Sequence, residues 1–244
     1  MIPTPSKQPL PMHFTHSERI WREFPRLVPG VLVVSGLHRG LEVEGRLARW
    51  LEPARERFSG RPESEVPEIE AWRRAYSQMG MKPTQYRSAA EALLRRFRKE
   101  GSIPRVHPFV DLSNVLSLAF ALPVAVFDLS RIDSFLMVRH ATGTEKYLAF
   151  SGEAETPAAG EVIFADRAGR AHARRWTFRQ SRESAVDVDT EHVLVVTEAL
   201  HDAARRDIAA LLDALVEEST AVGCSPRARA VLSVDSPRLD FEIG

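Results

Sequence analysis

The chain has 244 residues, 44% of them hydrophobic, which is enough to bury a large core in one domain or two small ones. Its 33 basic residues balance its 33 acidic residues, which argues against a protein whose whole surface coats nucleic acid. The single cysteine excludes an intramolecular disulfide, and no stretch reaches the roughly 18 consecutive apolar residues of a membrane helix. We therefore expect a cytoplasmic protein with no membrane partner.

Prolines recur through residues 1–30, and each lacks a backbone donor and restricts the residue before it. This segment is therefore expected to be an extended arm with little regular structure. Residues 31–244 contain no internal repeat, no low-complexity tract and no clear linker. We interpret them as one folded domain.

The first half of this domain shows the patterns of one strand and several helices. A β-branched run at 31–37 predicts a strand, and apolar periodicity predicts a helix over 41–58. Another helix is expected to end near Gly80, where glycine can adopt the left-handed cap. Residues 86–99 place apolar side chains on one helical face and basic side chains on the other, which predicts an amphipathic helix.

Residues 108–121 are apolar nearly all round, as in a buried helix, but three polar residues recur along them. Asp111, Asn114 and Ser117 follow one another at intervals of three, so they form a polar seam on this helix. Each polar group would cost about 1–3 kcal/mol if buried without a partner. The seam must therefore either bind nearby protein groups or line a cavity, and the sequence leaves both open.

Strand patterns dominate from Pro123 onward, and a helix is expected over about 199–219. Together the two halves predict an α+β fold of mixed and antiparallel sheets with helices, in two closely packed sublobes. The expected strands are the runs PVAVFD, FLMVRHA, EKYLAF, EVIFAD, HARRWTF and HVLVVTEAL.

Charge is unevenly distributed along the chain. Residues 82–105 hold seven basic and two acidic residues, and residues 167–182 hold six arginines and no acid. Such runs are typical of a solvated face, but arginines interleaved with Trp176 and Phe178 also suit a single-stranded RNA end. Alternatively, both rings pack into the core from a strand.

Several common sites are excluded by the absence of their motifs. The sequence has no phosphate loop, no GxGxxG after a strand, no HExxH and no GxSxG. Its eight histidines are scattered without the spacing of metal ligands. We expect neither a metal nor an organic cofactor.

Longer motifs follow one another along the chain: residues 103–132 are IPRVHPFVDLSNVLSLAFALPVAVFDLSRI, and VRHATGTEKY and TEHVLVVTEAL come later. The first resembles the run through a VD pair, an Asn and a PxxxFD strand in a known family, the tRNA-editing (B3/B4) domain of the phenylalanyl-tRNA synthetase β subunit. The other two resemble segments that follow this run in the same family. Free-standing relatives are similar over 71–96 and 160–181 as well.

The resemblance implies a B3/B4-like fold over residues 31–244 that hydrolyses the ester between a wrong amino acid and the 3′ adenosine of tRNA. The implied partner is aminoacylated tRNA, bound through its acceptor stem and CCA end, and not DNA. Some free-standing relatives deacylate tRNA charged with canavanine, an arginine analogue whose side chain needs a carboxylate partner. Nothing resembles an ATP-binding core, so the chain is not a tRNA ligase by itself.

Such a site needs a basic rim, an adenosine slot, oxyanion donors and a placed water, and the sequence offers residues for each without identifying the catalytic one. The pocket candidates are Asp111, Asn114, Ser117, Asp128, Glu161, Asp166, Arg174, Trp176, Arg179 and Gln180. The tRNA-binding candidates are Lys82, Arg87, Arg95, Arg98, Lys99, Arg105 and Arg175.

Two departures from the synthetase pattern bear on the substrate. Ala125 stands where the synthetase has a histidine of the editing pocket, so that residue's role does not transfer. RQSRES, with Glu183, replaces a glycine-glycine-glutamate loop that helps to bind a tyrosyl group. Removal of tyrosine from the phenylalanine tRNA is therefore not expected.

Two other classes of function are compatible with the same residues. A non-catalytic RNA-binding module would bind tRNA in a salt-dependent manner without turnover. A small-molecule protein would bind amino acids or their derivatives without tRNA.

Overall fold

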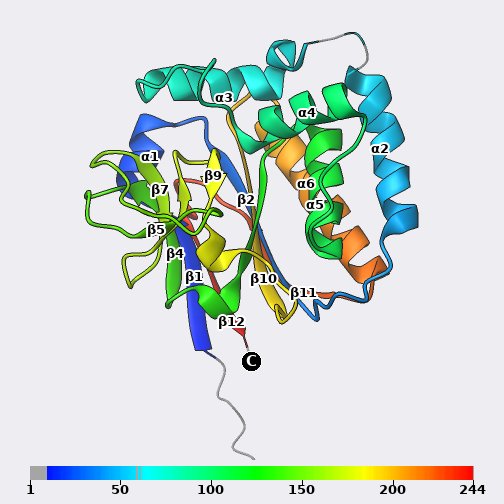
Figure 1. The fold of residues 1–244 in the computed structure, drawn as a ribbon. Helices are drawn as coiled ribbons and strands as arrows, with labels where there is room; N and C mark the ends of the chain where they lie inside the picture. Colours follow the sequence, from blue (N-terminus) through cyan, green and yellow to red (C-terminus); the bar gives the residue numbers. More distant parts are fainter. Residues whose placement is uncertain (1–9, 59, 61, 244) are drawn as a thin grey trace, which may run out of the picture.

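The computed structural model describes residues 10–58, 60 and 62–243, and a four-stranded antiparallel sheet lies at its centre (Figure 1). The strand order is β11-β2-β10-β3, so the two longest strands, β2 and β10, are paired on both sides. The strands are β2 (Val28–Ser35), β3 (Val124–Asp128), β10 (His192–Ala199) and β11 (Ser225–Val231).

Both faces of the central sheet are buried, which explains why its strands are continuous apolar runs. Along β2, Leu32 and Val34 belong to the core on one face, whereas Val31 and Val33 belong to the core on the other. Side chains alternate between the two faces of a strand, so the run VLVV supplies both cores at once.

Helices cover one face of the central sheet, to its right in Figure 1. The buried helix α5 (Pro108–Phe120) begins with a proline at its first position, and the His107 side chain before it accepts a hydrogen bond from Phe109 N. The helices of this layer are α2 (Glu44–Phe58), α4 (Ala89–Glu100), α5 (Pro108–Phe120) and α6 (Ala204–Ala221).

A six-stranded sheet of order β12-β1-β4-β7-β8-β9 covers the other face, together with α1 and α3. Neighbouring strands are antiparallel except β1 and β4, which are parallel. The elements are β1 (Leu10–His16), α1 (Glu18–Glu23), α3 (Pro67–Gln78), β4 (Phe135–His140), β7 (Val162–Ala165), β8 (Ala171–Arg174), β9 (Arg179–Gln180) and β12 (Arg238–Ile243).

Short elements complete the described chain. The strands β5 and β6 form a separate two-stranded sheet, and three 3-10 turns connect larger elements. Their bounds are β5 (Tyr147–Leu148), β6 (Ala154–Glu155), η1 (Glu63–Glu65), η2 (Leu129–Arg131) and η3 (Arg182–Ser184). Within the part of the chain that the structure describes, no helix has both the length and the apolar character to cross a membrane.

The α+β class with mixed and antiparallel sheets is confirmed, but the expected arm is wrong over residues 10–30. These residues form β1 and α1 and begin β2, while residues 1–9 lie outside the described residues. Pro11 lies within β1 and Pro29 within β2, because the fixed φ of proline is compatible with a strand. Prolines that suggested an arm therefore occupy sheet positions.

Two expected strands are much shorter in the structure, and several observed strands besides β1 were not expected. The run 145–150 forms a strand only at β5, and the run 172–178 ends as a strand at Arg174. The unexpected strands β11 and β12 lie in the last 20 residues, where charged residues interrupt the apolar pattern.

Gly30 lies where α6 packs closely on the central sheet. A Cβ at Gly30 would lie 2.7 Å from Ile208 Cγ2 and 2.9 Å from Thr197 Cγ2, distances so short that these neighbours must shift. We expect Gly30→Ala to lower the free energy of unfolding by about 1–3 kcal/mol, as overpacking of a core does. Urea unfolding followed by circular dichroism measures this change.

Gly45 in α2 is the matched control, because a Cβ there meets no atom within 4 Å. Gly45→Ala should leave stability unchanged or raise it by up to about 1 kcal/mol, since alanine favours the helix. Equal effects of the two substitutions would contradict the close packing of α6 on β2.

Candidate functional site

A small cavity of about 70 Å³ lies where the edges of the two sheets meet. One wall comes from the start of β3, the edge strand of the central sheet, and the opposite wall comes from the turn between β8 and β9. The lining residues include Ala89, Pro123, Val124, Ala125, Phe164, Ala173, Trp176, Phe178, Arg179, Gln180 and Glu198. Three predicted pocket residues, Trp176, Arg179 and Gln180, therefore share one site.

An unusual turn after β8 directs Trp176 into the protein. Arg175 and Trp176 both have left-handed backbone angles, with φ of 47° and 59°, which are uncommon for residues other than glycine. The Trp176 backbone N–H donates to Val162 O at 2.8 Å, and its ring packs edge-on against Trp72 and Phe24. Strained backbone of this kind persists only where surrounding contacts hold it. Here the buried indole is held in an aromatic cluster.

The floor of the cavity is a buried carboxylate. Glu198 in β10 is 1% exposed, and its two oxygens accept from His16 Nε2 at 2.7 Å and from Trp176 Nε1 at 2.9 Å. Its backbone oxygen also accepts from Trp72 Nε1 at 3.2 Å. A buried carboxyl group requires such partners, because polar atoms buried without a hydrogen-bond partner are costly.

Sequence reasoning missed both Glu198 and His16. The available signal was a carboxylate inside the apolar run VLVVTEAL, which is unfavourable unless that residue has buried partners. His16 could not be identified in the same way, because it lies in the segment expected to be an extended arm. Only the parallel pairing of β1 with β4 brings it to the site.

Arg179 and Gln180 form the polar edge of the cavity. The Gln180 side chain donates to Val126 O at 2.7 Å, which ties β9 to β3 across the two sheets. Arg179 has a side chain that is 41% exposed, lies over the Tyr147 ring, and approaches Glu155 at 3.5 Å. Arg179 therefore lies at the entrance of the cavity, where part of its side chain is exposed.

A cationic and aromatic group lies beside the cavity. The Arg175 guanidinium is 4.7 Å from the Tyr86 ring centroid and 5.8 Å from that of Phe178, and the two rings pack edge to face. The amino end of α4 adjoins this group, since Ala89 N donates to Thr177 O at 2.7 Å. Partial positive charge at a helix amino end adds to the charge of the arginines.

The predicted polar seam on α5 does not line this cavity. The α5 helix packs against the opposite face of the central sheet from Trp176. Asp111 accepts from Val106 N and from Arg105, and Ser117 donates to Leu122 O, so both bind neighbouring loops. Asn114 is half-buried on the same helix. For Asp111 and Ser117 the structure therefore agrees with the first alternative, in which the polar seam binds nearby protein groups.

The other predicted carboxylates also have structural partners away from the cavity. Asp128 accepts from Ser130 and from Thr190 Oγ1. Glu161 receives two hydrogen bonds from Arg174, at 2.9 and 2.8 Å. Arg174 is itself buried and lies outside the cavity lining.

The predicted basic surface is largely neutralised by acids from elsewhere in the chain. Arg95 and Arg98 pair with Glu63, and Arg105 pairs with Glu44 and Asp111. The Arg87 side chain is 3.6 Å from Glu91. Two exposed candidates, Lys82 and Lys99, have no carboxylate partner among the residues that the structure describes.

Asp166 closes the turn between β7 and β8. Burial would raise the pKa of its carboxyl, but the His172 imidazole 3.2 Å away and hydrogen bonds from Arg170 and the Asp133 backbone outweigh burial and hold the pKa well below its usual range. The lowered pKa means that the ionised form stabilises the fold above the unfolded pKa near 3.8, and that this stabilisation is lost as the pH falls below it.

We expect Asp166→Asn to lower the free energy of unfolding by about 1–3 kcal/mol at pH 7, because its donors lose an ionised acceptor. The difference in free energy of unfolding between the variant and the wild type should become smaller as the pH falls below about 3.8. Urea unfolding across this pH range measures it, with the exposed residue Asp189 replaced by asparagine as the control. If the difference in free energy of unfolding between the variant and the wild type did not change with pH, this would contradict the lowered pKa of Asp166.

Comparisons with known proteins agree with the resemblance expected from the motifs. The fold is similar to an N-terminal fragment of the phenylalanyl-tRNA synthetase β-subunit from Pyrococcus horikoshii, with a TM-score of 0.52 at 13% sequence identity. The likeness covers 98% of this chain but 57% of that fragment. A search of curated proteins gave no significant match. A family model described as the B3/4 domain matches residues 71–219, more than half of the chain, and the protein therefore belongs to the B3/4 domain family.

Proposed function

We propose that the protein is a trans-acting deacylase that acts in the cytoplasm and hydrolyses the ester of mischarged aminoacyl-tRNA. The observation that supports this most is the convergence of Trp176, Arg179, Gln180 and Glu198 on one cavity, at the junction of the two sheets. The cavity lies in a B3/4-family chain whose fold is similar to that of a fragment of a tRNA synthetase subunit. These residues offer a cation, an amide and a carboxylate within one small site.

The rim of the cavity suits the 3′ end of tRNA. Bases of single-stranded RNA stack on aromatic rings and on arginine, and Tyr86, Phe178 and Arg175 present both kinds of surface beside the entrance. The exposed Arg179 guanidinium can pair with a terminal phosphate or stabilise an oxyanion that develops on the ester. The proposed path therefore leads from the acceptor stem over this rim into the cavity.

The volume of the cavity limits what enters it. At about 70 Å³ the cavity is smaller than a cavity of about 150 Å³ that accepts benzene, so it favours a short side chain. Ala125 contributes to this space, since a histidine at this wall would fill it. A longer side chain requires the turn that carries Phe178 and Arg179 to move outward.

Canavanine or another cationic side chain would need an acid in the cavity. The acids proposed from the sequence bind structural partners, whereas Glu198 lines the cavity. Glu198 is therefore our candidate for the specificity residue. Its oxygens already accept from His16 and Trp176, so a guanidinium would share the carboxylate with them.

A non-catalytic RNA-binding module is the second candidate function. It is favoured by the burial of Glu198, which leaves the cavity without an exposed carboxylate or histidine to activate water. Catalysis by the first candidate would instead rely on a hydroxyl of the terminal ribose and on oxyanion stabilisation. Binding of tRNA without release of the amino acid would select the second candidate.

Substitution of the entrance arginine tests the proposed activity. We expect Arg179→Ala to lower kcat/KM for deacylation by about 100-fold or more, as loss of one donor to a developing oxyanion does. The assay is release of radiolabelled amino acids from a panel of mischarged tRNAs by the purified protein. Activity of the variant equal to that of the wild type would remove Arg179 from the site.

Arg182 provides the matched control, because it is an exposed arginine three residues further on and does not line the cavity. Arg182→Ala removes the same charge as Arg179→Ala, but it should keep the activity of the wild type because Arg182 does not line the cavity. An equal loss in both variants would mean that overall charge, and not the entrance position, determines the rate.

Glu198→Gln tests the acid proposed for specificity. If Glu198 binds a cationic side chain, kcat/KM for tRNA carrying arginine or canavanine should fall at least 10-fold further than for tRNA carrying a neutral amino acid. Circular dichroism must show a folded variant, because the same carboxylate binds His16 and Trp176. Asp128→Asn, which alters a buried acid away from the cavity, should leave the ratio between the two substrates unchanged.

A further inference from the structure

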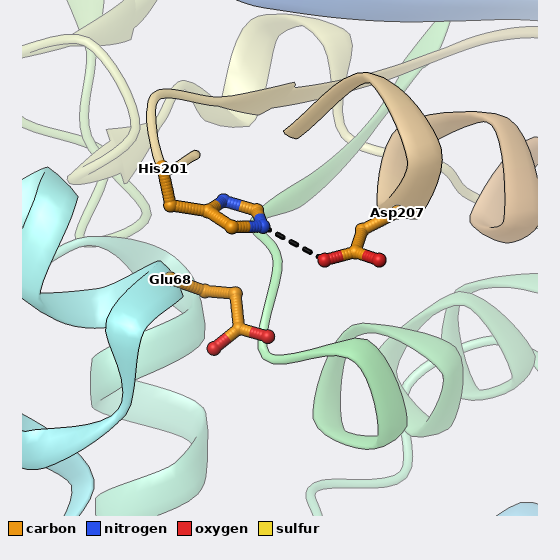
Figure 2. Close-up of side chains that lie close together, drawn as sticks. All are labelled: Glu68, His201 and Asp207. Carbon is orange, nitrogen blue, oxygen red and sulfur yellow. Dashed lines mark hydrogen bonds and ion pairs between the residues drawn. The ribbon is translucent and has the colours of Figure 1, made fainter. Parts of the chain in front are cut away.

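Three metal-ligating side chains from distant parts of the sequence meet away from the cavity. Glu68 is the second residue of α3, His201 follows β10, and Asp207 lies in the first turn of α6 (Figure 2). One ligand atom from each lies within 4.8 Å of the other two. His201 Nε2 is already 2.8 Å from Asp207 Oδ2, and Figure 2 shows the Glu68 carboxylate directly below this pair.

One oxygen of this cluster has no hydrogen-bond partner among the residues that the structure describes. The Glu68 side chain is 7% exposed, yet its Oε2 atom is buried without a hydrogen-bond donor. A buried carboxylate oxygen left without a partner is unfavourable, so the site favours a ligand that supplies positive charge. The unpartnered oxygen belongs to the residue that Figure 2 places next to His201 and Asp207.

Two arginines orient the carboxylates from outside the cluster. Arg57 donates to Glu68 Oε1, and Arg206 donates to Asp207 Oδ1 at 2.8 Å. Each carboxylate therefore keeps its second oxygen for the cluster. Hydrogen bonds of this kind to the outer atoms of metal ligands fix the ligand geometry in metalloproteins.

We propose that Glu68, His201 and Asp207 bind one divalent transition-metal ion of the Zn²⁺ type, through Oε2, Nε2 and Oδ2, with water completing the coordination. Imidazole nitrogen combined with carboxylate oxygen suits Zn²⁺, whereas Mg²⁺ and Ca²⁺ prefer oxygen ligands alone. Ligands at about 2.0–2.1 Å in a tetrahedron lie about 3.3 Å apart. The His201–Asp207 separation of 2.8 Å must therefore open by about half an ångström when the ion binds.

The ion would fix α3 to the connection between β10 and α6. This junction also supports the floor of the cavity, because Trp72 of α3 donates to the backbone oxygen of Glu198, three residues before His201. The inferred role is structural and does not depend on any activity of the protein. Spacing along the sequence gave no sign of the site, since Glu68 lies more than 130 residues before His201 and Asp207.

Calorimetric titration of the chelator-treated full chain with ZnCl₂ tests the site directly. We expect one Zn²⁺ per chain, and a loss of affinity of more than about 100-fold in His201→Ala and in Glu68→Gln, since changes to outer-shell partners alone cost 10–100-fold. A hundredfold excess of Zn²⁺ over its Kd should raise the Tm of the wild type by roughly 5–10 °C and leave that of the variants unchanged. Millimolar Mg²⁺ or Ca²⁺ should not compete.

The exposed His38 supplies the control, and His38→Ala should bind Zn²⁺ as tightly as the wild type. Glu68→Gln is nearly isosteric and keeps an acceptor for Arg57, so circular dichroism should show it folded even if His201→Ala is not. Absence of Zn²⁺ binding by the wild type would overturn the proposal. Undiminished binding by folded Glu68→Gln would overturn it equally, because the ion would then lie elsewhere.

Discussion

The docking of the two sheets depends on one buried carboxylate. Glu198 belongs to the central sheet, whereas its partners His16 and Trp176 belong to the six-stranded sheet and its β8–β9 turn. A buried polar group that loses its hydrogen-bond partner typically costs about 1–3 kcal/mol, so positions of one sheet on the other that break these bonds are disfavoured. Apolar packing between sheets is less directional, and it would tolerate small shifts that these hydrogen bonds do not.

The cavity follows from this constraint. The bond to Glu198 holds the Trp176 indole inside the protein, and the left-handed backbone at Arg175 and Trp176 is the conformation that allows it. The chain then reverses direction within a few residues, which brings Phe178 and Arg179 back to the edge of β3. A regular strand through this segment would have placed alternate residues on opposite faces of the sheet. The hydrogen bonds to Glu198 thus compensate for the strain in the β8–β9 turn. The shape of this turn places Phe178 and Arg179 at the rim of the cavity.

Local patterns predicted the fold where local interactions determine it. The α5 helix and β10 begin and end within a few residues of their expected bounds, since a nearly continuous apolar run marks each of them in the sequence. The segment 172–178 was expected to be one strand because its residue types favour strands, but the tertiary bond from Trp176 to Glu198 overrides that preference. β1 was missed because its partners, β4 and β12, lie more than 100 residues away.

The candidate site was only half predictable, because the sequence does not show which charges neutralise each other. The excess of basic residues on α4 suggested an RNA-binding face, yet Glu63, from before α3, pairs with both Arg95 and Arg98. Acids that end strands, such as Asp166, bind the donors of their own turns. Glu198 differs because it interrupts an apolar strand, where no local donor can satisfy it. An ionisable residue in such a position must recruit partners from other elements, so it indicates a buried polar junction more reliably than any local excess of charge.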